Sequence, residues 1–362
     1  MSRFPMKAFT CQRCDQLLFF ENTLCLRCRA EVGFVASELD LAVLEPGYRS
    51  DLRHCANRTL AACNWMLEPG DAGPLCFSCR LTRTRPADGN PIGLSEFATA
   101  EGAKRRLLFQ LLDLGLPIED DLRFDLLSSQ AGPVTTGHAD GLITIDLAES
   151  DDAQREERRT ELDEPYRTVL GHFRHEIGHY YWPILVQRAG LEQEARRRFG
   201  DERSDYSRAL QRHYETGPPE DWEERYVSAY ATMHPWEDWA ETFAHYLHIR
   251  DTLETAGAFG IVVAGPPEVD DLSLTAVPEP DVGARPFEAI LADWLPLTYA
   301  LNAVNRSMGR DDLYPFTLAP AVIEKLSFVH DRVVAAAHLE NKTDLHGHIR
   351  SPSATRGPAG HG

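Results

Sequence analysis

No cysteine follows Cys79 in this chain of 362 residues, although eight cysteines lie between Cys11 and Cys79. The first residues, Met1 to Lys7, also lack the apolar stretch that an export signal needs. Without export, cysteines stay reduced, and clustered thiols then bind metal rather than form disulfides. The sequence therefore predicts a cytoplasmic protein whose N-terminal part holds metal and whose remainder folds without disulfides.

Long apolar runs and an excess of basic residues are also missing. No uninterrupted apolar stretch approaches the roughly 20 residues that a membrane-spanning helix needs. Acidic residues outnumber basic residues by 56 to 37, which gives a net charge of −19 and argues against a broad nucleic-acid-binding surface. The chain is 43% apolar, so it can build a real core. Its length allows about two or three domains.

The eight cysteines divide into two sets of four. The first set consists of two C-x2-C pairs, each of which places two thiolates on one tight turn, and the second set is spaced less regularly. The sets are Cys11, Cys14, Cys25 and Cys28, then Cys55, Cys63, Cys76 and Cys79. His54 is the alternative to Cys55 as a ligand. Four thiolates bind zinc tetrahedrally, so we expect two structural zinc ions that stabilise a zinc-ribbon module over residues 1–85.

The motif His175-Glu-Ile-Gly-His179 predicts a third metal site. Residues four apart lie on one face of a helix, so the two imidazoles can hold one cation. The helix is predicted over residues 163–182, with Asp163 as its cap. Glu176, beside the first histidine, is the expected general base. It takes a proton from water that zinc has activated and passes the proton to the leaving amine.

A catalytic zinc needs a third protein ligand, and the chain offers candidates on a second helix. A third histidine six residues after the second is excluded, because Leu185 occupies that position. Four later side chains of ligand type fall on one helical face, namely Glu237, Glu241, His245 and His248. We expect Glu237 as the ligand and Glu241 as the acceptor of a ligand histidine's N–H. The spacing also allows the reverse assignment, or His245 as the ligand.

The rest of the chain predicts an α+β fold that is mainly helical with a small sheet. Residues 86–94 form a turn-rich linker to a zincin-like domain over residues 95–340, and residues 341–362 form a disordered tail. Strands are expected at residues 122–127 and 142–147, with a turn at 137–141. Helices are expected at residues 95–114, 191–214, 220–233, 235–250, 286–308 and 318–338.

Two stretches resemble a known family: HEIGHYYW at residues 175–182 and HPWEDWAETFAHYLH at residues 234–248. With the cysteine pairs, they make the chain similar to bacterial zinc-binding metallopeptidases that carry an N-terminal zinc ribbon. The resemblance covers the chain except its tail. It implies hydrolysis of a peptide or protein substrate, with one catalytic and two structural zinc ions and a glutamate as third ligand. By analogy with zincins, residues 142–147 are a candidate for the edge strand that receives the substrate, and an ordinary sheet strand is the equal alternative.

A narrower likeness concerns the pattern Glu-x-x-Ala-Glu-x-Phe at residues 237–243, which is similar to lethal-factor-type peptidases. There the first glutamate binds zinc, and a tyrosine seven residues earlier assists catalysis. This likeness favours Glu237 as the ligand and implies that Tyr230 donates a hydrogen bond to the developing oxyanion. Other candidates for that role are Tyr180, Tyr181 and Tyr226.

A function from a different class is the alternative. The zinc ribbon would bind a partner protein or nucleic acid, and the helical domain would be an inactive zincin. Residues 1–85 hold 11 Lys/Arg against 9 Asp/Glu, and Arg80, Arg83 and Arg85 lie near their end. Against this alternative, every residue type that the hydrolase needs is present. We therefore prefer the active peptidase, with a protein partner rather than nucleic acid or a membrane at the ribbon.

Overall fold

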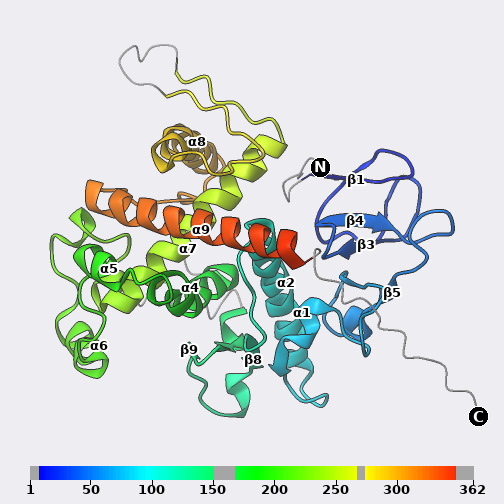
Figure 1. Ribbon diagram of the computed structural model, residues 1–362, viewed down its shortest axis with the longest axis horizontal. Coiled ribbons are helices and arrows are strands. Elements are labelled where there is room, and N and C mark those ends of the chain that lie inside the picture. The colour runs from blue at the N-terminus through cyan, green and yellow to red at the C-terminus, as the bar shows by residue number, and fades with distance from the viewer. Residues whose placement is uncertain (1–7, 151–167, 267–273, 348–362) are drawn as a thin grey trace, which may run out of the picture.

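The N-terminal part of the protein is built from three short antiparallel hairpins. The structure, a computed structural model, describes residues 8–150, 168–266 and 274–347 (Figure 1). In chain order, β1 (Phe9–Thr10) pairs with β2 (Leu17–Leu18), β3 (Val32–Val35) with β4 (Asp40–Val43), and β5 (Arg53–His54) with β6 (Met66–Leu67), before α1 (Phe77–Arg80). Such short strands bury little apolar surface, so this module needs other support.

A four-stranded sheet follows, in the order β7-β8-β10-β9. Its strands are β7 (Thr82–Thr84), β8 (Arg123–Leu127), β9 (Gly137–Ala139) and β10 (Leu142–Asp146). β8 runs parallel to both β7 and β10, whereas β9 returns antiparallel along β10. Apolar side chains at every second position of the two central strands are fully buried, which fixes their register: Phe124, Leu126, Ile143 and Ile145.

The edge strand beside β10 is β9, which corrects one expectation. Residues 142–147 are a candidate for the sheet edge, but β10 lies between β8 and β9. The segment predicted as a plain turn, residues 137–141, contains β9 and then a tight turn in which Asp140 and Gly141 have φ of 48° and 79°. A turn with positive φ at two successive residues matches the twist of the strands that it joins. β9 and β10 can therefore pair as a hairpin with only a few residues between them.

The segment after the cysteines joins the sheet. β7 pairs with β8, and the Arg83 guanidinium contacts both carboxylate oxygens of Asp125, at 3.0 and 2.5 Å. α2 (Pro91–Asp113) then begins inside the predicted linker of residues 86–94. Asn90 caps this helix by accepting a hydrogen bond from the Gly93 N–H, and proline suits the first turn. Only a short stretch between β7 and α2 is therefore left as a connection.

The hairpin module and α2 share one core. Phe9, Phe20 and Phe34 surround Phe109 of α2, with ring centroids 6.5, 5.4 and 5.4 Å from its ring. Aromatic pairs at these distances stabilise a contact beyond the area that they bury. The N-terminal module is thus packed onto the helical part through its largest side chains.

A buried cluster of charges crosses the same junction. The Lys104 ammonium donates to Glu101 at 2.6 Å, and both side chains are fully buried. The other oxygen of Glu101 lies 3.8 Å from Sγ of Cys79, while Arg105 donates to the Ala61 carbonyl at 3.0 Å. The contacts of Glu101 with Cys79 and of Arg105 with the Ala61 carbonyl therefore join the cysteine-rich module to α2.

Helices make up most of the remaining described chain. They are α4 (Val169–Trp182), α5 (Glu192–Phe199), α6 (Tyr206–Thr216), α7 (Pro235–Ala258), α8 (Phe287–Ser307) and α9 (Pro320–Gly347). In Figure 1 the hairpins lie at one end, α5 and α6 at the other, and α4, α7 and α9 between them. The mainly helical α+β fold with small sheets is thereby confirmed. No helix in the described part of the chain is both long and apolar enough to cross a membrane.

Some helix boundaries differ from expectation. α4 begins at Val169, because the Thr168 hydroxyl accepts the Gly171 N–H, and the predicted cap, Asp163, lies outside the described residues. Residues 191–214 form two helices, since Gly200 takes a φ of 96° that ends α5. α9 runs to Gly347, past residue 341 where the tail is predicted to start, and residues 348–362 lie outside the described ranges.

The helix predicted at residues 220–233 is absent. This described segment holds two short 3-10 turns instead, at Trp222–Glu224 and Tyr230–Thr232. The Lys325 ammonium of α9 donates a hydrogen bond to the Arg225 carbonyl at 2.6 Å. A tertiary contact therefore satisfies a carbonyl that would otherwise accept a backbone hydrogen bond within a helix.

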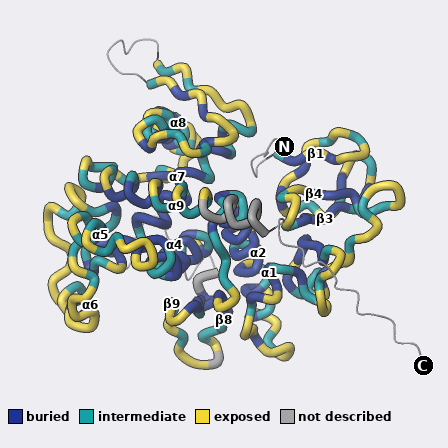
Figure 2. The backbone as a smooth tube through the Cα atoms, in the orientation of Figure 1, coloured by how far each residue is buried: buried dark blue, intermediate teal, exposed yellow. Residues whose placement is uncertain are grey.

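α4 and α7 approach each other closely at Gly178 and Ala240. At Gly178, an added Cβ would lie 2.9 Å from Cα and 3.2 Å from the carbonyl oxygen of Ala240. The Trp239 indole donates to the Gly178 carbonyl at 2.8 Å, and Tyr181 stacks on Phe243 at 5.4 Å. Both helices are buried along this contact (Figure 2). The two small residues therefore set the distance between the HEIGH motif and the start of α7.

We expect Gly178→Ala to destabilise the protein by about 1–3 kcal/mol, because the added methyl would push α4 away from the α7 backbone. Gly102→Ala on α2 is the matched control. A Cβ there meets only the far end of Arg105 at 3.9 Å, so alanine should be neutral or stabilising by up to about 1 kcal/mol. Urea unfolding of both variants measures this difference, and equal stabilities would contradict the close packing.

Candidate metal centres

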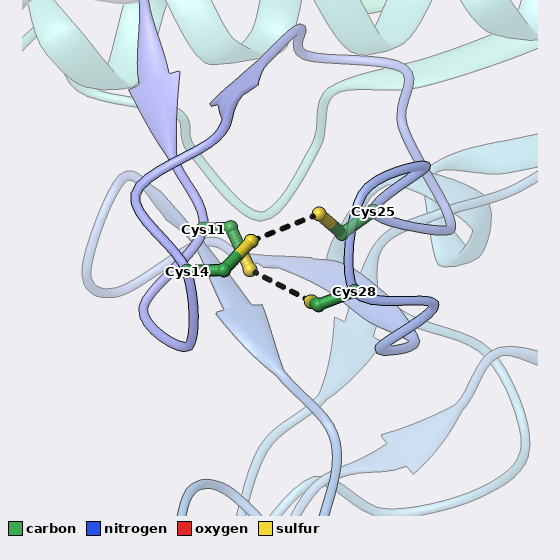
Figure 3. Close-up of side chains that lie close together, drawn as sticks. All are labelled: Cys11, Cys14, Cys25 and Cys28. Atoms are coloured by element: carbon green, nitrogen blue, oxygen red, sulfur yellow. Dashed lines mark hydrogen bonds between the residues drawn. The ribbon is translucent and has the colours of Figure 1, made fainter.

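The first four cysteines converge on one point from two turns (Figure 3). Sγ of Cys11 lies 3.6 Å from that of Cys28, and Sγ of Cys14 lies 3.6 Å from that of Cys25. These distances are far above a disulfide bond and close to the edge of about 3.8 Å in a tetrahedron with Zn–S bonds of about 2.3 Å. The turns are therefore arranged for a metal.

The second four cysteines form a more deeply buried group. Sγ of Cys63 lies 3.6 Å from Sγ of both Cys76 and Cys79, and Cys55 accepts a hydrogen bond from the Cys76 backbone N–H at 3.4 Å. All eight cysteines of the chain are free thiols. His54, the alternative to Cys55, is exposed and contacts Arg58, and the group that could hold a metal contains Cys55.

The two histidines of the HEIGH motif meet a glutamate from α7. Nε2 of His175 lies 3.2 Å from Nε2 of His179, and Oε2 of Glu237 lies 3.0 and 3.5 Å from those two nitrogens. These three donor atoms lie within 4.8 Å of one another, so the group could hold one metal ion. Burial would raise the pKa of Glu237, but hydrogen bonds from the histidines outweigh it and lower that pKa. The glutamate thus stays ionised beside them.

Glu241 lies one turn further along α7 and contacts the opposite side of His175. Its Oε1 is 2.6 Å from Nδ1 of that histidine, and its Oε2 accepts a hydrogen bond from the Ser228 hydroxyl at 2.6 Å. Burial opposes ionisation of Glu241, yet the hydrogen bond from His175 lowers its pKa to about 2. Both carboxylate oxygens are therefore occupied, and His175 is held by Nδ1 with Nε2 turned toward His179.

Glu176 is buried beside the same histidines. Its side chain is 7% exposed, and its Oε2 has no hydrogen-bond partner among the described residues. Burial raises its pKa above the ordinary value, although the charges of His175 and His179 act in the opposite direction. A buried carboxylate oxygen without a protein partner is costly unless a metal, water or substrate satisfies it.

Two tyrosines approach the metal-binding group. The predicted Tyr230 places its ring 6.0 Å from that of His175. Tyr206 of α6, which the sequence analysis did not single out, donates to Oε1 of Glu237 at 3.1 Å. Burial raises the pKa of both phenols, so each keeps its proton at neutral pH. No sequence signal marks Tyr206, since it lies outside both motifs in a charged segment.

The edge strand β9 supplies a further neighbour that the sequence analysis missed. His138 lies nearly parallel to His179, with ring centroids 6.5 Å apart. Burial lowers the pKa of His138 to about 4, so it is neutral at physiological pH. The sheet edge therefore reaches the metal-binding group through β9, not through residues 142–147.

The other candidates lie away from the three donor atoms. Nδ1 of His245 is 2.8 Å from the Tyr314 hydroxyl, and His248 packs against the rings of Trp294 and Tyr314. Burial lowers the pKa of His245 to about 4. The hydroxyls of Tyr180 and Tyr181 bond to the backbone of Glu119 and Pro117, and Tyr226 packs on Lys325. These side chains thus have structural partners.

The fold and these clusters define a protein with an N-terminal zinc-ribbon domain and a mainly helical metal-binding domain. The chain belongs to the family described as "Putative zinc-binding metallo-peptidase", whose model matches residues 93–332. A zinc-ribbon domain model matches residues 8–90. Both matches confirm the resemblance that the motifs indicate.

Similar proteins occur in mycobacteria. One from Mycobacterium bovis and two from strains of Mycobacterium tuberculosis are each 50% identical to this chain over 333 residues, which is 90% of this chain and 94% of theirs. Their names describe them as uncharacterized proteins, so the similarity to them does not indicate which reaction this chain catalyses. No solved structure matches the chain.

We expect purified protein to contain about three zinc ions per chain, one for each group of donor atoms. Cys55→Ser should lower the content by about one, because it removes a thiolate from a closed site. His54→Ala should leave the content unchanged. Elemental analysis after gel filtration measures both variants. Zinc loss in His54→Ala but not in Cys55→Ser would assign the ligand to the histidine.

Proposed function

We propose that the protein is a zinc-dependent peptidase whose catalytic zinc is held by His175, His179 and Glu237. The observation that carries this proposal is the convergence of one donor atom from each of these residues within 4.8 Å. Two imidazoles and one carboxylate form a donor set that leaves a coordination position open in catalytic zinc sites. Peptidase chemistry is the function described for the family.

The surroundings of the donor atoms fit zinc. Ligand histidines of zinc usually donate their other N–H to a carboxylate, and Glu241 occupies that place on Nδ1 of His175. Glu241 is itself held by Ser228, so its role is to orient the histidine. The orphaned oxygen of Glu176 beside these residues is a second sign that the group serves a bound species.

The chain's own residues then divide the work of hydrolysis. Zinc held by His175, His179 and Glu237 would supply Lewis-acid chemistry, since it would lower the pKa of water and polarise the scissile carbonyl. Glu176 accepts a proton from the attacking water and delivers it to the leaving amine nitrogen. Tyr230 donates a hydrogen bond to the carbonyl oxygen as negative charge develops on it. The zinc ribbon supports this domain and offers a surface for a protein partner.

None of the eight cysteines forms a disulfide. Because disulfides are rare in a reducing compartment, this favours the cytoplasm as the location of the reaction.

The rival function, an inactive zincin that binds nucleic acid through its ribbon, has less support. Each of the three arginines that suggest it contacts a carboxylate: Arg80 contacts Asp71, Arg83 contacts Asp125, and Arg85 contacts Asp88. These pairs neutralise the charge that phosphate binding would need. The buried and unpartnered oxygen of Glu176 also favours the active enzyme.

We expect Glu176→Gln to keep all its zinc but to lose peptidase turnover by about 10²- to 10⁴-fold, because the amide cannot accept the water's proton. Glu223→Gln, at an exposed glutamate, is the control and should match wild type. Cleavage of a peptide library, abolished by a zinc chelator and restored by zinc, measures the activity. Wild-type rates in Glu176→Gln would refute the assigned base, and no chelator-sensitive cleavage by wild type would refute the peptidase.

A further inference from the structure

The two carboxylate oxygens of Glu237 face different partners. Oε2 lies 3.0 Å from Nε2 of His175 and 3.5 Å from Nε2 of His179, on the side where the donor atoms converge. Oε1 accepts a hydrogen bond from the Tyr206 hydroxyl at 3.1 Å. Only one oxygen of this glutamate is thus left for a metal ion.

Tyr206 reaches Glu237 from a separate helix that is fastened close to this point. Asp205 caps α6, and Ser204, next to that cap, is 3.0 Å from Nε2 of His234. His234 in turn caps α7, because its Nδ1 accepts the Trp236 N–H at 3.1 Å. The start of α6 is therefore fixed to the start of α7, three residues before Glu237.

The Tyr206 side chain is held by both its ring and its hydroxyl. The residue is 38% exposed, so most of its surface is covered. The ring lies 5.2 Å from that of His234, and the hydroxyl donates to Oε1 of Glu237.

We infer that Tyr206 is a positioning residue that makes Glu237 a single-oxygen ligand of the catalytic metal. This inference rests on the proposed function, because it assumes that the site holds zinc. A carboxylate can bind a metal through one oxygen or two, and a hydrogen bond from a phenol occupies the second oxygen. The metal then has three protein donors and keeps a position for water or substrate.

The two oxygens of the neighbouring carboxylate, that of Glu241, also face different partners. Glu241 uses Oε1 for His175 and Oε2 for Ser228, at 2.6 Å each. Glu237 and Glu241 thus each give one oxygen to the histidine side and one to a hydroxyl from a different segment. In this arrangement the hydroxyls of Tyr206 and Ser228 set how each carboxylate is used.

The test compares Tyr206→Phe with Tyr214→Phe in the full-length protein. Both changes remove one hydroxyl from α6, but Tyr214 is 71% exposed and its ring contacts only His213 among the described rings. The structural zinc ions stay in place, and only the catalytic site is emptied by mild chelation and reloaded. We expect Tyr206→Phe to bind zinc there 10- to 100-fold more weakly in chelator competition, as losses of such supporting contacts do. Tyr214→Phe should match wild type.

Cobalt(II) in the catalytic site reports the coordination number. Wild type and Tyr214→Phe should show the intense visible absorption of four-coordinate cobalt, and Tyr206→Phe the weaker absorption of a five-coordinate ion. An unchanged zinc affinity and an unchanged cobalt spectrum in Tyr206→Phe would overturn the inference. A five-coordinate spectrum in wild type would overturn it as well, even if the variant did not fold. These readouts need no substrate, so absence of peptidase activity would refute the proposed function separately.

Discussion

The contact of α4 with α7 is the constraint on which the candidate site depends. The two backbones approach so closely at Gly178 that a Cβ there would lie 2.9 Å from Cα of Ala240. The HEIGH histidines lie on the face of α4 that this contact turns toward the first turns of α7. Two imidazoles alone are too few ligands for a catalytic zinc ion, which needs three from the protein. The third, the Glu237 carboxylate, lies close to them only because α4 and α7 pack together.

The cysteine-rich module is tied to the same helical framework. Its aromatic side chains surround Phe109, and the buried pair of Glu101 and Lys104 lies beside Cys79. Metal bound by the second cysteine group would therefore stabilise α2 as well as the hairpins. α2 also reaches the functional helices directly, because Gln110 donates to the Leu247 carbonyl of α7 at 2.6 Å. The ribbon is therefore packed against the domain that carries the histidines.

Much of this organisation was predictable because it depends on local spacing. The cysteine pairs, the HEIGH motif, the helix that begins at Pro235 and the mainly helical fold follow from residue types at fixed intervals. The predictions that are wrong concern segments whose structure depends on contacts with distant parts of the chain. The segment at residues 220–233 is bound by Lys325 of α9, and the strand at residues 142–146 becomes central because β9 adds to it. Tyr206 belongs to no motif, so only its contact with Glu237 reveals it.

The sequence by itself determined which groups can bind metal and that they form three sets, since thiolates, imidazoles and carboxylates in those patterns have few other uses. The spacing alone could not rank Glu237 and Glu241, because residues four apart share one helical face, and only the likeness to lethal-factor-type peptidases favoured Glu237. The tertiary structure separated them: Oε2 of Glu237 faces both Nε2 atoms, whereas Glu241 faces Nδ1 of His175. The physical reason is the placement of α7 relative to α4, which periodicity along one chain segment does not encode.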